Sequence, residues 1–176
     1  MNEYLSMQIN GEVNIFTDGS CNSVKRSSRI GWSFVVEYDE NIVHTQHGHL
    51  KIGRKKKKLG ILYAEATAIL NALEYVIAKE FKSAVIFSDS LYNIHAIYRP
   101  YVDWKNPVIT SFVNRAMILL KQAAEKHIDI NILFCKSHNQ LEGNELADEL
   151  AKCGRKKIKS YHAKIHKYID KTDSIA

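Results

Sequence analysis

The spacing at which apolar residues recur changes along the chain. The order of these changes restricts the fold more than any other feature of the sequence. Three strand-like runs come first, at residues 13–17, 31–38 and 41–52, and the polar pair Asp39-Glu40 between the last two predicts a hairpin. Apolar side chains then recur at spacings of three and four over residues 62–79, which predicts an amphipathic helix. Three strands followed by a helix begin an α/β fold.

Strands and helices alternate in the rest of the chain. The predicted elements are a strand at 84–87, a helix capped by Asp89 or Ser90 and running to about Tyr98, a helix at 108–127, a strand at 130–135 and a helix at 144–152. Because crossovers through helices join parallel strands, we expect a single sheet of mixed direction flanked by helices. The length of 176 residues suits one domain, which we place at residues 1–154.

Positive charge is concentrated in two segments of the chain. Residues 51–58 contain six basic side chains and no acidic one, and residues 155–176 contain seven basic and two acidic. The remainder has 12 basic and 17 acidic side chains, although the whole chain is net +6. This separation suits binding to a polyanion, with Lys55–Lys58 and the tail as candidates for phosphate contacts, but solvated lysines are the commoner explanation of such runs.

Residues 155–176 form a separate basic tail in this interpretation. Five apolar side chains of the tail share one helical face, which predicts a basic amphipathic helix over residues 157–170. Such a helix docks on its own domain, pairs with a second copy or contacts nucleic acid, and docking is the most common outcome. The five side chains are Ile158, Tyr161, Ile165, Tyr168 and Ile169.

Nothing in the sequence indicates secretion or a membrane span. The N-terminus lacks the basic start and apolar block of a secretory signal, and the apolar stretch at residues 59–77 is interrupted by Glu65, Asn71 and Glu74. Three cysteines without a C-x-x-C spacing favour reduced thiols over disulfides or zinc ligation. We therefore expect a protein of the cell interior or of a virion, monomeric by default.

Two of the predicted strands end in the same way. The runs VNIFTD and AVIFSD end at Asp18 and Asp89, and ligands bind at the carboxyl ends of strands in open α/β sheets. Either residue alone has an ordinary explanation, because Asp18 begins a group of turn residues, 18–20, and Asp89 can cap the helix that follows. The repeated context favours one shared site.

Glu65 is a third candidate for that site. It lies at the border of the apolar stripe of its helix, where a carboxylate either faces a cleft or complements the helix dipole, and the sequence does not distinguish the two. Carboxylates that converge from several elements repel one another unless cations lie among them, and such oxygen ligands suit Mg²⁺ or Mn²⁺. Two ions of this kind support phosphodiester hydrolysis.

Four segments, in this order, resemble one known family. They are FTDGSCN (16–22), YAEATAILNALEYV (63–76), VIFSDSLYNIHAI (85–97) and KSHNQLEGNELADELAK (136–152), within residues 13–153. The chain resembles the type 1 ribonuclease H domain, most of all the domains in reverse transcriptases of non-LTR retrotransposons. The resemblance implies a five-stranded mixed sheet flanked by helices. It also implies endonucleolytic hydrolysis of the RNA strand of RNA–DNA hybrids with two Mg²⁺ ions, for which Mn²⁺ can substitute.

The resemblance implies metal-binding and catalytic roles for four carboxylates and a catalytic role in proton transfer for one histidine. The carboxylates are Asp18, Glu65, Asp89 and Asp148, and the histidine is His138, on a loop of the site. The sequence offers another explanation of Asp148. On the helical wheel it points away from Leu146 and Leu150, and it can form a surface ion pair with Lys152 one turn later.

Contacts to the RNA strand also follow from the resemblance. Cys21 and Asn22 stand where the family reads the 2′-hydroxyls of RNA, and Asn144 either contacts the substrate or caps the last helix. Ile61-Leu62-Tyr63 stands where many members have polar side chains and Arg. The basic protrusion of some members has no counterpart between Ile97 and Val108.

Two other functions are compatible with the sequence. A nuclease of the same fold could act on another duplex, such as double-stranded RNA or DNA, and a non-catalytic module could bind hybrids or single strands. The complete set of acidic residues argues against the second, because clustered negative charge beside a phosphate weakens binding.

Overall fold

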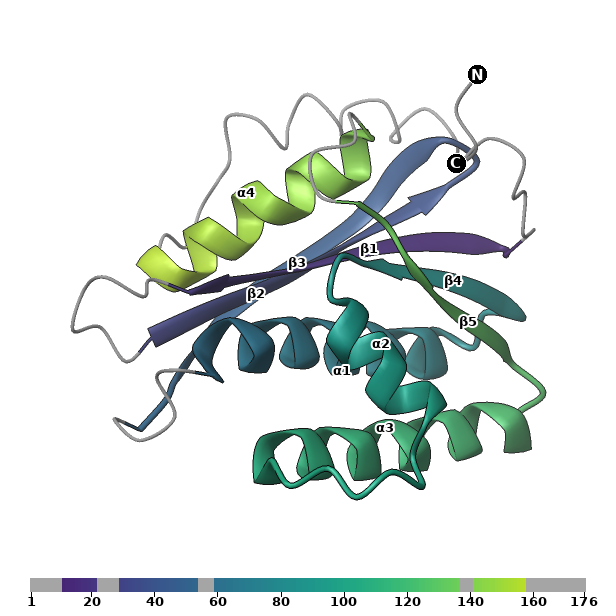
Figure 1. The fold of residues 1–176 in the computed structure, drawn as a ribbon. Coiled ribbons are helices and arrows are strands. Elements are labelled where there is room, and N and C mark those ends of the chain that lie inside the picture. The colour runs from purple at the N-terminus through teal and green to yellow at the C-terminus, as the bar shows by residue number, and fades with distance from the viewer. Residues whose placement is uncertain (1–10, 22–28, 54–58, 137–140, 158–176) are drawn as a thin grey trace.

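Five strands form one mixed sheet in the computed structural model, which describes residues 11–21, 29–53, 59–136 and 141–157 (Figure 1). The strands are β1 (Val13–Cys21), β2 (Arg29–Tyr38), β3 (Asn41–Lys51), β4 (Ser83–Ser88) and β5 (Asp129–Phe134), in the order β3-β2-β1-β4-β5. The first three pair antiparallel, whereas β4 pairs parallel with β1, and β5 pairs parallel with β4. The predicted five-stranded mixed sheet is confirmed.

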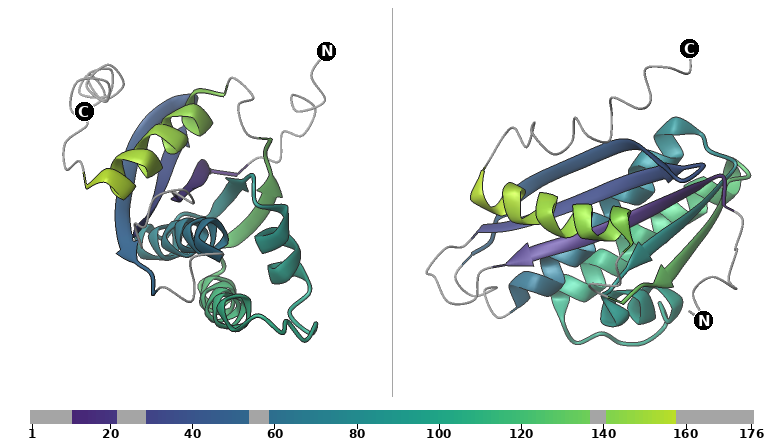
Figure 2. Two further views of the ribbon diagram at one scale, coloured as in Figure 1. Left: turned by 60° about the vertical axis from the view of Figure 1, so that its left-hand side comes forward. Right: turned by 90° about the horizontal axis from the view of Figure 1, so that it is seen from above.

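Helices cover both faces of this sheet in the described part of the chain. They are α1 (Gly60–Lys79), α2 (Leu91–Tyr98), α3 (Pro107–Glu125) and α4 (Glu142–Lys156). α4 lies on one face, and the other three lie on the opposite face (Figure 2). Successive side chains of β1 point to opposite faces of the sheet and meet both layers of helices. Val13 and Ile15 belong to the cluster that includes α1 and α3, whereas Phe16 packs with Leu146 and Leu150 of α4.

The helix α1 is long and apolar enough, by length and composition alone, to cross a membrane. Many of its apolar residues lie in the core instead, where Ala68, Ile69, Leu73 and Val76 are fully buried in the cluster shared with the sheet and α3. The central helix of a sheet protein is buried along much of its surface, so it is apolar for that reason.

The hairpin predicted at Asp39-Glu40 is confirmed. Both residues have positive φ angles, 48° and 61°, which is the backbone of a tight turn whose twist matches the two strands. The pairing of β2 with β3 shifts by one residue between Val36 and Glu37. This bulge turns His44 toward Tyr75 of α1 and Ile42 toward the cluster of α4.

The strand β1 continues past the end that the sequence predicts. Residues 18–20 pair with residues 31–33 of β2, so the strand runs to Cys21 and the prediction of a turn at 18–20 is wrong. Residue types that favour turns stay extended here because the neighbouring strand supplies hydrogen bonds to their backbone.

The prediction of Asn144 as a helix cap is also wrong. α4 begins at Glu142, with Leu141 at the N-cap position, so Asn144 lies inside the helix. Acidic side chains in the first turn complement the helix dipole, and Gly143 packs closely on Phe16, where an added Cβ would lie 2.4 Å from a ring carbon. These contacts let the helix start one turn earlier than the cap signal suggests.

The start of α2 matches its predicted position but not its predicted hydrogen bond. Ser90 occupies the N-cap position, and its side chain makes no capping hydrogen bond. The backbone N–H of Ser90 instead donates to Oγ of Ser88, at 3.2 Å. The turn after β4 is therefore held by the serine that precedes Asp89.

Two basic segments lie outside the described residues. They are Lys55–Lys58 and the tail from residue 158, so the predicted tail helix stays a prediction. α4 ends at Lys156, two residues beyond the boundary expected at residue 154. Cys21, Cys135 and Cys153 are free thiols in the structure.

α4 lies so close to β2 at Gly31 that one added methyl group is expected to destabilise the fold. A Cβ at Gly31 would lie 2.0 Å from the carbonyl oxygen of Ala151 and 2.4 Å from the backbone nitrogen of Arg155. Backbone atoms cannot rotate away, so we expect Gly31→Ala to lower the free energy of unfolding by about 1–3 kcal/mol, measured in urea. Gly53→Ala is the control, because nothing lies within 4 Å of its added Cβ. Equal stabilities of the two variants would contradict the prediction.

Candidate active site

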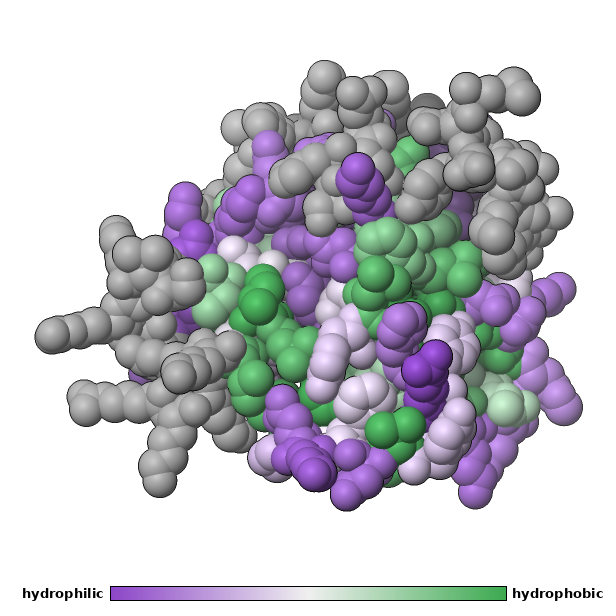
Figure 3. Space-filling view, in the orientation of Figure 1, coloured by the Kyte–Doolittle hydropathy of each residue, from purple (hydrophilic) through white to green (hydrophobic). Residues whose placement is uncertain are grey.

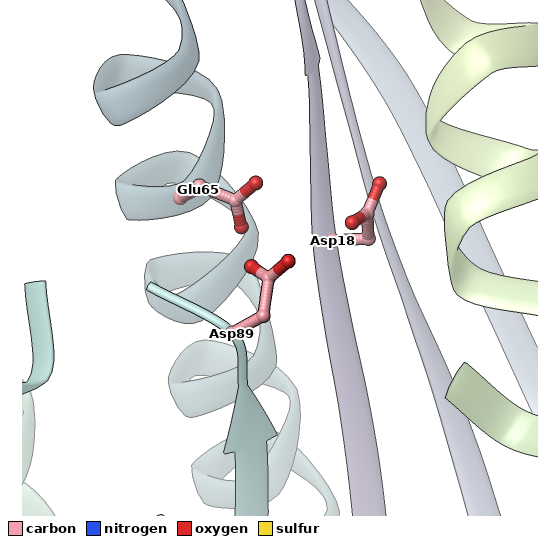
Figure 4. Close-up of side chains that lie close together, drawn as sticks. All are labelled: Asp18, Glu65 and Asp89. Carbon is pink, nitrogen blue, oxygen red and sulfur yellow. The ribbon is translucent and has the colours of Figure 1, made fainter. Parts of the chain in front are cut away.

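Three acidic side chains from three elements meet near the middle of the sheet. Asp18 belongs to β1, Glu65 belongs to α1, and Asp89 directly follows β4 (Figure 4). Each offers a carboxylate oxygen, and these oxygens all lie within 4.8 Å of one another. The site that the two similar strand ends and Glu65 predict is therefore formed.

Asp18 lies where the pairing of β1 changes. The parallel pairing with β4 ends at Thr17, opposite Ser88, whereas the antiparallel pairing with β2 continues through Asp18, opposite Ser33. The side of β1 next to β4 is thus open from Asp18 onward, and Asp89 follows β4 at the same level. This end of parallel pairing lies at the carboxyl end of β4, where α/β sheets bind ligands.

Glu65 reaches the site because α1 lies directly against β1. A Cβ on Gly19 would lie 2.4 Å from the backbone nitrogen of Glu65 and 2.7 Å from the carbonyl carbon of Ala64, so only glycine permits this approach. Glu65 is 5% exposed and belongs to the second turn of α1. It faces the cleft, and the alternative role of complementing the helix dipole in the first turn is wrong.

The pKa of Asp18 is raised from its ordinary 3.8 to about 8, mainly by burial. The charges of Asp148 and Asp89 contribute to this rise, whereas Lys152 and a hydrogen bond from the backbone of Gly19 oppose it. Oδ2 of Asp18 is buried and has no hydrogen-bond partner among the described residues. The protein therefore compensates the ionised form of this carboxyl group only in part.

Glu65 is in the same electrostatic position. Burial, followed by the charges of Asp18 and Asp89, raises its pKa well above the ordinary 4.5. Its Oε2 is also buried without a hydrogen-bond partner in the described part of the chain. Such a pair of buried carboxyl groups needs protons or cations, and oxygen ligands of this type suit hard divalent ions.

An open pocket of about 370 Å³ contains this site. In Figure 3 hydrophilic side chains gather between α4 and the start of α2, with hydrophobic side chains to either side. Residues from β1, α1, α4 and the turn between β4 and α2 line the pocket, so the sheet and the helices on both of its faces contribute. They are Asp18, Gly19, Ile61, Leu62, Glu65, Asp89, Ser90, Asn144, Glu145 and Asp148.

The position of Asp148 is compatible with both explanations that the sequence offers for it. It lines the pocket and its charge acts on Asp18 and Glu65, but it is not one of the three carboxylates within 4.8 Å of one another. Its Oδ2 also accepts a hydrogen bond from Nζ of Lys152, at 2.5 Å, in an i,i+4 ion pair on α4. The surface pair and the place in the pocket are compatible.

The other candidate residues have different positions. Asn144 lines the pocket from within α4, whereas half-buried Cys21 packs at the end of β1 beside Ile30 and Ala64 and does not line it. Asn22 and His138 lie outside the described residues.

Sequence reasoning missed one acidic side chain of the pocket, Glu145. The signal was available, because Glu145 precedes Asp148 by three residues and so shares its face of the helix. Ser90 was identified only as a helix cap, although it also lines the pocket.

Comparisons with known proteins agree with this fold and site. The sequence profile of the RNase H family matches residues 10–156. The chain is 28% identical to Ribonuclease HI of Haemophilus ducreyi over 148 residues, which is 81% of this chain and 89% of that protein. It is also 28% identical to Ribonuclease HI of Pasteurella multocida over 149 residues, again 81% of this chain and 89% of the relative.

Solved structures of RNase H1 proteins share the fold. RNase H1 from the archaeon Halobacterium salinarum superimposes with a TM-score of 0.67 at 21% identity, covering 84% of this chain and 99% of the other. LC11-RNase H1, solved in complex with an RNA/DNA hybrid, gives a TM-score of 0.61 at 18% identity, with 84% and 99% covered. The closer likeness to domains of non-LTR retrotransposons stays a prediction. The profile match spans most of the sequence, and we conclude that this chain belongs to the RNase H family.

Proposed function

We propose that this protein is a ribonuclease H that hydrolyses the RNA strand of RNA–DNA hybrids endonucleolytically. The observation that supports this most is the convergence of Asp18, Glu65 and Asp89 within 4.8 Å in an open pocket. Within the described residues no second group of three such side chains could hold a metal ion. Relatives named Ribonuclease HI, and an RNase H1 structure solved with an RNA/DNA hybrid, support the same substrate.

The donor set fits divalent cations, and we propose Mg²⁺, with Mn²⁺ able to substitute. Asp18, Glu65 and Asp89 would hold the ions, with Asp148 as a fourth ligand from α4. Each of Asp18 and Glu65 has a buried oxygen that finds no hydrogen-bond partner in the part of the chain that the structure describes, and the pKa values of both groups are raised. Both observations fit residues that need cations for charge balance. When bound, two such ions make water nucleophilic and stabilise the leaving oxygen of an in-line displacement at phosphorus.

The fold holds the carboxylates in position and leaves the pocket accessible to substrate. Pairing of β1 with β2 holds the backbone of Asp18, and the contact of Gly19 with α1 holds Glu65 beside it. The pocket opens to solvent, so that a phosphate of a duplex can enter. Cys21 at the end of β1 and Asn144 of α4 are the proposed contacts to the RNA strand from the described residues, and Asn22 is a third. His138 stays the proposed proton shuttle.

A cleavage assay on matched duplexes tests the function directly. Hybrid, double-stranded RNA and double-stranded DNA of one sequence, labelled on either strand, would be incubated with Mg²⁺, with Mn²⁺ and with chelator. We expect cuts only in the RNA strand of the hybrid, and no cleavage above background in chelator. Cleavage of another duplex at a similar rate would indicate a nuclease of different specificity. Hybrid binding without cleavage in either metal would indicate a non-catalytic module.

A further inference from the structure

Asn93 is a polar residue in an apolar position of α2. It is fully buried, and its neighbours along the helix, Ile94, Ala96 and Ile97, belong to the main hydrophobic cluster. A buried amide costs free energy unless all its polar atoms are bonded, and a residue such as leucine would avoid that cost. The stability of the fold therefore does not explain why asparagine occupies this position.

The amide of Asn93 connects two helices beside the carboxylates. Its Nδ2 donates a hydrogen bond of 3.2 Å to the carbonyl oxygen of Leu62, in the first turn of α1. Leu62 lines the pocket and precedes Glu65 by three residues, and Asn93 follows Asp89 by four. The carbonyl can only accept, so the donor end of the amide must face it, and Oδ1 is left buried without a hydrogen-bond partner among the described residues.

This bond completes a pair of constraints on Glu65. The close contact of Gly19 with Glu65 fixes α1 relative to the strand that carries Asp18. The Asn93 bond fixes the start of α1 relative to the segment that carries Asp89. Repulsion among the three carboxylates favours a wider spacing, and the two constraints oppose it.

We propose that Asn93 is a positioning residue that holds Glu65 and Asp89 at the spacing needed to bind divalent cations. The proposal rests on the proposed function, and it assigns Asn93 no contact with substrate. It also accounts for Oδ1, which has no hydrogen bond within the described ranges, because the amide is retained for the geometry of the neighbouring site at a cost in stability.

Asn93→Leu tests the proposal, because leucine has a similar size and cannot donate. In this variant the Leu62 carbonyl keeps the hydrogen bond of the α1 ladder, so no new polar group is left unbonded. We expect the affinity for Mn²⁺, measured by calorimetry without substrate, to fall at least threefold. We expect kcat for hybrid cleavage to fall at least tenfold, with KM within twofold of wild type and a melting temperature no lower than wild type.

Asn71→Leu is the matched control. Asn71 also donates from Nδ2 to a carbonyl oxygen of α1, that of Thr67 at 2.8 Å, but both residues belong to the same helix. We expect its Mn²⁺ affinity and kcat to stay within twofold of wild type. Asn93→Gln keeps the donor and is expected to recover part of both quantities.

Three outcomes would overturn the proposal. Asn93→Leu could keep its Mn²⁺ affinity and kcat within twofold of wild type, or Asn71→Leu could lose as much as Asn93→Leu. If Asn93→Leu does not fold, the same measurements on Asn93→Val decide, and failure of both to fold would mean that Asn93 supports the fold instead of the site. A wild-type protein that binds Mn²⁺ but leaves hybrids uncut would refute the proposed function, while the Mn²⁺ affinities would still test Asn93.

Discussion

Asp18→Asn is expected to reduce hybrid cleavage at least about a thousandfold, which corresponds to roughly 4 kcal/mol of transition-state stabilisation. The carboxylate is central to the site, since its oxygen lies within 4.8 Å of those of Glu65 and Asp89. An amide of the same shape offers a neutral oxygen that binds hard cations weakly. Glu65→Gln and Asp89→Asn should have comparable effects. Initial rates at saturating hybrid and Mg²⁺, with circular dichroism to confirm the fold, measure them.

Asp129→Asn is the control for these substitutions. Asp129 is exposed at the start of β5, opposite Ser83, at the far end of β4 from the carboxylates. Its replacement removes one negative charge from the surface and should leave the rate within twofold of wild type. If Asp18→Asn or Asp89→Asn kept a tenth of the wild-type rate, the assignment of the site would be wrong.

Without divalent cations, Asp18→Asn is expected to be more stable than wild type at pH 8, by about 0.5–2 kcal/mol. The pKa of Asp18 is raised from 3.8 to about 8 on folding, mainly by burial. Between these values the folded state binds more protons than the unfolded state, so the free energy of unfolding falls as pH rises from 3.8 to about 8. Asparagine carries no charge and avoids this loss.

Calorimetric melting in chelator at pH 5.5 and pH 8 measures this effect. The advantage of Asp18→Asn over wild type should be larger at pH 8 than at pH 5.5. At a metal concentration a hundredfold above Kd, wild type should gain about 2.7 kcal/mol, or roughly 5–11 °C in Tm, and Asp18→Asn much less. An equal difference between variant and wild type at both pH values would contradict the role of the buried charge.

The element order and the three central carboxylates could be predicted from the sequence because both depend on local signals. The spacing of apolar residues distinguishes strands from helices over a few residues. The two similar runs that end at Asp18 and Asp89 can be read in the sequence itself. Glu65 was harder, since a helical wheel places it at a border but does not show what lies opposite. Only the approach of α1 to Gly19 settles that it faces the cleft.

Features that depend on pairing between distant segments could not be predicted. The extension of β1 through residues 18–20 arises from its antiparallel partner, against the local preference of those residue types. The early start of α4 depends on the contact of Gly143 with Phe16. Asn93 gave no signal, because a lone polar residue in a short apolar helix acquires meaning only when Leu62 lies across from it.

Because β1 pairs in parallel with β4, the two strands that deliver Asp18 and Asp89 are about seventy residues apart in sequence. A growing polypeptide on the ribosome already includes Asp18 and Glu65 when β4 has yet to be synthesised, and it cannot close the pocket. Long-range pairing of this kind is slow, and the site cannot form before it. An amino-terminal fragment that stops before β4 would therefore have two of the three carboxylates but no complete active site.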